Sequence, residues 1–344
     1  MLIVYSQDHQ YHNPSVEFVD GKFSLPFEHP RRAETVLEQI CEIGLGRIIA
    51  PKNFGSEPIL RVHDEGFVRF LQTAWDEWTI ALREGEAFPF TWVGRSMRHD
   101  KVPQTSDGKL GYYAFDAGTP ITSGTWRAAT TSVNVALTAQ ELIVKGESAA
   151  FALCRPPGHH AARDLYGGYC FLNNAAIAAQ AFRDAGAERV AILDVDYHHG
   201  NGTQAIFYSR RDIFFVSLHA HPSLEYPYFL GYEDERGTGE GEGYNLNYPL
   251  PWGTNWMSYQ ALLEDAMQAI NKYSPDVLVV SLGVDTFEKD PIGKFQFQGK
   301  DYLRLGEAIA RLKKPTLFAM EGGYAINELG TNIANVLLGF ESIS

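Results

Sequence analysis

Carboxylate and imidazole side chains alternate along one short stretch of the chain. In the segment RVAILDVDYHHGNG (189–202), an apolar run leads into Asp194, Asp196 and His198, which are spaced two residues apart. In an extended chain this spacing places all three side chains on one side. Carboxylate and imidazole without thiolate favour Zn²⁺ or Fe²⁺, and two buried acids are costly without a cation or hydrogen-bond donors. The segment therefore predicts a metal site; the alternative is a helix-capping aspartate with solvated neighbours.

A third metal ligand is available from a distant segment. The apolar run VLVVSLGVD (277–285) ends in Asp285. By itself such an aspartate is usually a cap or turn residue, and it becomes a candidate ligand only beside Asp196 and His198. Two carboxylates and one histidine would leave coordination positions open for water and substrate, as catalytic zinc sites require.

Two further apolar runs end in groups that suit acid–base chemistry and oxyanion binding. RPPGHH (155–160) presents His159 and His160, whose imidazoles suit general acid–base catalysis, although tandem histidines are also found as incidental surface residues. TLFAMEGGY (316–324) ends in a glycine turn that presents Tyr324. A tyrosine in a turn ordinarily packs against neighbours, but a phenol beside a metal can donate to a developing oxyanion. Each signal is weak alone, and their convergence predicts a hydrolase.

These segments alternate with amphipathic stretches as in an α/β protein. Apolar, β-rich runs lie at 2–5, 47–51, 149–154, 189–196, 212–219, 277–285 and 316–324, and helical patterns include 29–44, 173–187, 255–273 and 300–313. Near-continuous apolar strands separated by helices indicate a parallel sheet covered on both faces. We therefore predict one α/β domain over residues 1–344, with a central, mostly parallel sheet of about eight strands flanked by helices on both faces. Ligands bind outside the carboxyl ends of the strands in such sheets.

Residues 84–119 interrupt the alternation. The segment shows little periodicity and is too long for a routine connection, which is typical of functional or disordered loops. Six aromatic residues argue against simple disorder; they are Phe88, Phe90, Trp92, Tyr112, Tyr113 and Phe115. We predict an insertion loop that narrows the entrance to the site.

Composition limits the classes of partner. Lysine and arginine number 29 against 42 acidic residues, so the net charge is −13. This balance argues against nucleic acid, whose binding needs clustered cations. It is compatible with a cationic substrate, although solubility alone also explains an acidic surface. No apolar run reaches the ~18 residues of a membrane span, so we expect no membrane partner.

The cysteines and the N-terminus predict a cytoplasmic location. Three widely spaced cysteines suit a reducing compartment better than a disulfide framework; they are Cys41, Cys154 and Cys170. The first residues, MLIVYSQDHQ, show neither a basic region nor a signal-peptide cleavage site.

Six motifs together resemble one known family. The segments RPPGHH, GGYCFLNN, LDVDYHHGNGTQ, SLHAHP, SLGVDTF and EGGY are similar to those of the arginase–deacetylase superfamily, in its histone-deacetylase-like branch. Within that branch the similarity is greatest to bacterial acetylpolyamine amidohydrolases, and it covers nearly the whole chain. The resemblance implies the arginase–deacetylase fold and zinc-dependent hydrolysis of acetylated polyamines or related small acetylated amines. Deacetylation of protein acetyl-lysine by the same mechanism is the alternative.

The resemblance also implies roles for the residues singled out above. Asp196, His198 and Asp285 match the ligands of one zinc ion per chain, with Fe²⁺ as an alternative metal. His160 matches the main general acid and base, His159 an electrostatic partner, and Tyr324 the residue that polarises the scissile carbonyl. Asp194 matches the partner of the first histidine, and Asn201 that of the second. A structural K⁺ site is implied at Asp194, Asp196, His198, Ser217 and Leu218.

For the substrate, the resemblance implies a tunnel with an acidic mouth and a homodimer. Its walls match Tyr169 and Tyr226, next to Gly168, and the candidate acids for a distant ammonium are Asp107, Asp116 and Glu17.

The sequence departs from the family pattern in three respects. Asn201 replaces an aspartate found in some members, the walls are tyrosine where phenylalanine is usual, and Gly118 stands at one glutamate position. An asparagine orients an imidazole without supporting an imidazolium as a carboxylate would. The wall hydroxyls are expected to affect acyl preference.

Two rivals remain open at this stage. An arginase-like dinuclear manganese hydrolase would need a second acidic cluster after the later strand, but Thr286 and Phe287 follow Asp285. A module that binds acetylated proteins without turnover could lack a catalytic residue, but every matching position is filled.

Overall fold

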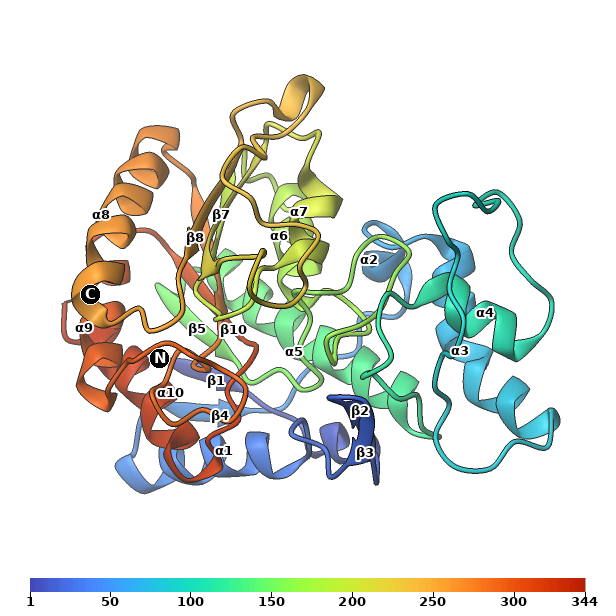
Figure 1. Cartoon of the computed structure of the whole chain (residues 1–344). Coiled ribbons are helices and arrows are strands. Elements are labelled where there is room, and N and C mark those ends of the chain that lie inside the picture. The colour runs from blue at the N-terminus through green and yellow to red at the C-terminus, as the bar shows by residue number, and fades with distance from the viewer. Residues whose placement is uncertain (344) are drawn as a thin grey trace.

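A fully parallel sheet forms the centre of the molecule. The computed structural model describes residues 1–343, and its eight-stranded sheet has the order β4-β1-β5-β10-β9-β6-β7-β8 with every pair parallel (Figure 1). The strands are β1 Leu2–Val4, β4 Arg47–Ile49, β5 Ala149–Ala152, β6 Val190–Asp194, β7 Ile213–Ala220, β8 Asn245–Leu250, β9 Val277–Leu282 and β10 Thr316–Met320. The predicted α/β fold with about eight strands is confirmed.

Helices cover both faces of this sheet. They are α1 Arg31–Ile43, α2 Glu57–Leu60, α3 Glu65–Ile80, α4 Ser106–Tyr113, α5 Thr125–Val144, α6 Asn174–Asp184, α7 Asn201–Phe207, α8 Trp256–Tyr273, α9 Gly299–Ala310 and α10 Ile326–Glu341. Helices α1, α8, α9 and α10 pack into one hydrophobic core, while α3, α5 and α6 pack into a second (Figure 1). No helix within residues 1–343 has both the length and the apolar character that crossing a membrane requires.

Strand β9 shows why these sequences read as continuous apolar runs. Leu278, Val280 and Leu282 face the core under α8 to α10, whereas Val277 and Val279 face the core under α5 and α6. Successive side chains of a strand point to opposite faces. A strand covered on both faces must therefore be apolar at every position.

Some elements have no clear counterpart in the sequence pattern. Strand β8 at the sheet edge reads NLNYPL, and its asparagines and proline interrupt an apolar run. A short antiparallel pair, β2 Glu17–Val19 and β3 Lys22–Ser24, lies outside the main sheet. Within 84–119 the chain is ordered around α4, which begins at the N-cap Thr105 and carries Tyr112 and Tyr113.

Candidate metal centre and active site

Three side chains converge beyond the carboxyl ends of β6 and β9. Asp196, His198 and Asp285 each offer one ligand atom, and these atoms lie within 4.8 Å of one another. His198 Nδ1 is 3.0 Å from Asp285 Oδ2 and 3.4 Å from Asp196 Oδ1. The structure thus brings the two distant segments together, as the sequence predicted.

The chemistry of these donors fits a divalent cation. Both carboxylates are fully buried, and burial, followed by the charge of Asp196, raises the pKa of Asp285 to about 7. Two buried carboxylates cannot both ionise cheaply unless a cation lies between them. The backbone packs closely against these carboxylates: a Cβ on Gly283 would lie 2.0 Å from Asp196 Oδ2, and one on Gly322 would lie 2.4 Å from Asp285 Oδ2.

Turns after β6, rather than an extended chain, aim these ligands. The strand ends at Asp194, so the prediction that alternation alone places all three polar side chains together is wrong. The backbone N–H of His198 donates to Asp196 Oδ1 at 2.9 Å, and that of Gly322 donates to Asp196 Oδ2 at 2.7 Å. The N–H of Tyr197 donates to Asp285 Oδ1 at 2.8 Å. Asp194 is not in this group, and its Oδ2 lies 3.0 Å from His159 Nδ1.

The two histidines after β5 have different partners. His159 Nδ1 is 3.0 Å from Asp194 Oδ2, and His160 Nδ1 is 2.6 Å from Asn201 Oδ1. Burial lowers the pKa of His159, but the carboxylates of Asp194 and Asp196 outweigh it and raise the pKa to about 10. Burial, followed by the neighbouring His159, holds the pKa of His160 well below its usual range.

This contrast assigns the protonation states of the pair. The directions of these shifts favour the imidazolium form of His159 and the neutral form of His160. Because the amide oxygen of Asn201 can only accept, His160 carries its proton on Nδ1 and leaves Nε2 free as a base.

The Gly-Gly turn after β10 fixes Tyr324. Gly323 has φ +124°, a conformation that side chains rarely adopt. The backbone N–H of Tyr324 donates to Asp290 Oδ2 at 2.7 Å, and the guanidinium of Arg32 lies 4.6 Å from the phenol ring centre. Tyr324 is 7% exposed and lines the same cavity as His160 and His198. Its side chain therefore belongs to the site.

Sequence reasoning missed two buried ionisable residues, one that holds this turn and one that connects it to the tandem histidines. Arg32, on α1, donates from Nε to the carbonyl of Gly323 at 2.7 Å and from Nη2 to the carbonyl of Glu321 at 2.5 Å. Glu321 Oε2 accepts from the backbone N–H groups of Gly158 and His159 at 2.6 and 3.1 Å. Arg32 sits in an ordinary amphipathic pattern and Glu321 in a turn, so neither has a local signal of its role.

A cavity of about 440 Å³ connects this chemistry to the surface. Tyr169 and Tyr226 line it, as predicted for the walls, and Gly168 and Asp116 line it as well. Asp20, Glu225 and Lys294 are further charged lining residues that the sequence did not single out. Acidic groups therefore outnumber cationic ones in the lining.

Two predicted acids are not among the residues that line the cavity. Asp107, on α4, pairs with Arg83 and is not among the residues that line the cavity. Glu17, on β2, is 1% exposed, and burial raises its pKa to about 7. Asp116 is thus the predicted acid that the structure places in the cavity lining.

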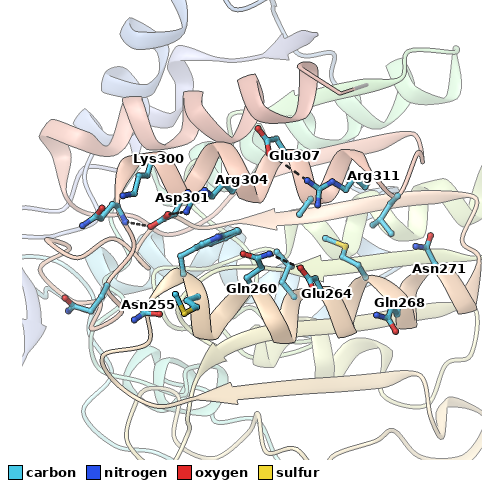
Figure 2. A pocket seen from close by; sticks show the side chains of 18 residues that line it. Asn255, Gln260, Glu264, Gln268, Asn271, Lys300, Asp301, Arg304, Glu307 and Arg311 are labelled. Carbon is cyan, nitrogen blue, oxygen red and sulfur yellow. Dashed lines mark hydrogen bonds and ion pairs between the residues drawn. The ribbon is translucent and has the colours of Figure 1, made fainter.

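A larger surface groove of about 890 Å³ runs between α8 and α9. Its ion pairs lie along α9 itself: Arg304 pairs with Asp301 at 3.1 Å and Arg311 with Glu307 at 4.0 Å (Figure 2). Among residues 1–343, the group able to hold a metal lies at the other site. Volume alone therefore does not mark the functional site.

Fold and site together define a class of protein. A parallel α/β domain that presents a two-carboxylate, one-histidine metal centre beside a base and a phenol has the parts of a metal-dependent hydrolase.

Residues 26–340 match the family described as the histone deacetylase domain, and the chain belongs to that family. This membership makes it a hydrolytic, metal-dependent deacetylase.

Several known proteins are similar over their full length. The chain is 57% identical over 343 residues to acetylpolyamine amidohydrolase 2 of Pseudomonas aeruginosa, covering 100% of this chain and 99% of the relative. It is 47% identical to acetylpolyamine amidohydrolase of Mycoplana ramosa, covering 98% and 99%. A crystal structure of acetylpolyamine aminohydrolase from Burkholderia pseudomallei superposes with a TM-score of 0.95 at 39% identity, covering 100% and 99%.

Proposed function

We propose that the chain is a zinc-dependent amidohydrolase that removes the acetyl group from acetylated polyamines or related small acetylated amines, releasing acetate and the free amine. One observation carries the proposal: the metal-ligand group, the neutral imidazole of His160 and the phenol of Tyr324 meet at one cavity with a mainly acidic lining. Relatives named acetylpolyamine amidohydrolases, 57% and 47% identical, support the substrate class.

Asp196, His198 and Asp285 would hold the zinc ion, which when bound lowers the pKa of water toward ~7 and polarises the acetyl carbonyl. His160 accepts the proton of the attacking water at Nε2. Tyr324 donates a hydrogen bond to the oxyanion that develops on the acetyl oxygen. His160 then gives its proton to the departing nitrogen, a necessary step because an amine anion is a very poor leaving group. The positive charge of His159 stabilises the negative charge that develops nearby.

A structural K⁺ site is a second part of the proposal, and the register of the sheet supports it. Asp194 of β6 is paired with Ser217 of β7, and Leu218 follows it; all three are fully buried. We infer that Asp194, Ser217, Leu218 and the backbone of Asp196 and His198 hold a structural K⁺. A cation here would add to the charge of His159 in balancing the buried carboxylate of Asp194.

Native mass spectrometry tests the composition of the assembly. We expect a homodimer that carries two zinc ions, one per chain, because a single group of ligands converges within residues 1–343. Exposed apolar side chains of the 84–119 segment, Phe90 and Met97 among them, support a second copy as the dimer partner. Two divalent ions per chain would contradict the mononuclear site, and a monomer would contradict the dimer. A cytosolic location remains a prediction.

Competition among substrates tests the function itself. We expect kcat/KM for acetylputrescine, acetylcadaverine or acetylspermidine to exceed that for an acetyl-lysine peptide by at least ~10-fold, because acidic groups predominate in the cavity lining. A preference for the peptide would instead support the protein deacetylase alternative, and no turnover of any of them by zinc-loaded protein would refute the proposal.

A further inference from the structure

One carboxylate connects three segments of the cavity lining through hydrogen bonds. Asp116, at the end of the 84–119 loop, accepts at Oδ2 from the hydroxyl of Tyr226 at 2.7 Å and from the backbone N–H of Gly168 at 2.6 Å. Its other oxygen, Oδ1, accepts from the N–H of Gly118 at 3.1 Å. Tyr226 lies between β7 and β8, and Gly168 follows the tandem histidines. Segments distant in the chain therefore meet at a single side chain.

The position of Tyr226 links this carboxylate to the reacting groups. Its ring centre lies 5.1 Å from that of His160 and 6.0 Å from that of His198, and it stacks on Phe115 at 5.9 Å. Gly168 is packed equally tightly: it has φ +57°, and a Cβ there would lie 2.3 Å from His160 Cδ2. The ring of Tyr226 therefore packs beside His160 and His198, and its hydroxyl is held by Asp116.

The hydrogen bonds of Asp116 leave one acceptor position open. Burial, followed by the charge of Asp116, keeps the pKa of Tyr226 well above its usual value, so the hydroxyl stays protonated and donates. An ionised carboxylate has about four lone-pair sites. Oδ2 receives two donors, whereas Oδ1 receives one. Oδ1 therefore retains capacity for a donor from a molecule in the cavity.

We propose that Tyr226 is a positioning residue for substrate selection: its hydroxyl holds the Asp116 carboxylate so that Oδ1 accepts from the distant ammonium of the substrate. The proposal deepens the proposed function and rests on it. It also gives this wall hydroxyl a role besides the expected effect on acyl preference, because the hydroxyl donates to Asp116. With phenylalanine the ring still packs, but the carboxylate loses a charge-assisted hydrogen bond.

Steady-state kinetics of Tyr226→Phe test this on two matched substrates. N-acetyl-1,4-diaminobutane carries the ammonium, and N-pentylacetamide has a methyl group in its place. We expect KM for the charged substrate to rise about 10-fold with kcat nearly unchanged, the pattern of lost ground-state binding, and the size expected of one hydrogen bond to a charged group. The uncharged substrate should change less than about 2-fold. Equal changes for both substrates would refute the positioning role.

A double-mutant cycle separates action through Asp116 from a general structural effect. Tyr226→Phe should have almost no further effect in an Asp116→Ala background, because the carboxylate that it positions is gone. The matched control is Tyr232→Phe, which removes a hydroxyl bonded to the carbonyl of Tyr228 on the same β7–β8 connection; it should leave both substrates unchanged. Independent, additive effects of the Tyr226 and Asp116 changes would overturn the proposal.

Binding of the product provides a readout that does not require turnover. Calorimetry with 1,4-diaminobutane should show about 10-fold weaker binding to Tyr226→Phe than to the unchanged chain. If acetylated amines are not hydrolysed but this difference is found, the proposed function fails and the positioning role stands. If hydrolysis proceeds and binding of the diamine is equal in both proteins, the positioning role fails alone.

Discussion

Replacing His160 with alanine should lower kcat by more than ~10³-fold while the chain keeps its metal. His160 is the neutral imidazole of the site, with Nδ1 committed to Asn201 at 2.6 Å and Nε2 free. It serves as base for the water and as acid for the amine, so its removal affects both steps, and acid–base catalysis alone contributes about 10²–10⁴. His159 is a poor replacement, because its hydrogen bond to the carboxylate of Asp194 favours the protonated ring.

Metal content distinguishes this role from metal ligation. His160 is not in the group of Asp196, His198 and Asp285, so the variant should retain one ion per chain by elemental analysis. A matched control is His221→Ala, since His221 is partly exposed and bonded to Ser223 at 2.8 Å. Loss of the metal from the His160 variant would make it a ligand, and near-normal kcat would remove it from the mechanism.

Tyr324→Phe should lower kcat by ~10²–10³, the usual result of removing one oxyanion donor. Burial raises the pKa of Tyr324 well above its ordinary value, even though the charge of Arg32 opposes the shift. The phenol therefore stays protonated and able to donate at neutral pH. The effect should be mainly on kcat, because the oxyanion exists only in the transition state and the intermediate.

The folded structure should survive this substitution. The backbone of Tyr324 is held by Asp290, and the carbonyl of the preceding Gly323 is held by Arg32; neither contact involves the phenol oxygen. Melting temperature and metal content should therefore match those of the unchanged chain. Turnover within about threefold of normal would exclude Tyr324 as the oxyanion donor.

The sequence by itself determined the framework and the ligands. Each strand that carries a predicted metal or catalytic residue is buried on both faces, so its apolar run was readable without the structure. Polar residues directly after such runs must lie at one edge of a parallel sheet. This is why the sequence alone predicted that Asp196 and Asp285, 89 positions apart, belong to one metal site.

The motif resemblance supplied the roles of His159, His160 and Tyr324, and the family match supports the enzyme class.

The elements that the sequence did not predict have mixed local signals. Strand β8 is stabilised by pairing with β7 and by packing on α8, which override its own composition. Segment 84–119 was expected to be irregular, and α4 forms there because Thr105 caps it and tertiary contacts hold it.

Only the tertiary structure decided how the site is held and how its entrance is formed. Arg32 reaches the Gly-Gly turn from α1, nearly three hundred residues earlier in the chain, and Asp107 is directed to Arg83 instead of the cavity. Asp194 turns to His159, and the hydroxyl of Tyr226 finds Asp116 across 110 residues. Such contacts depend on the direction of single side chains across packed segments. Local periodicity specifies which face a residue occupies, but it carries no information about the partner that it meets there.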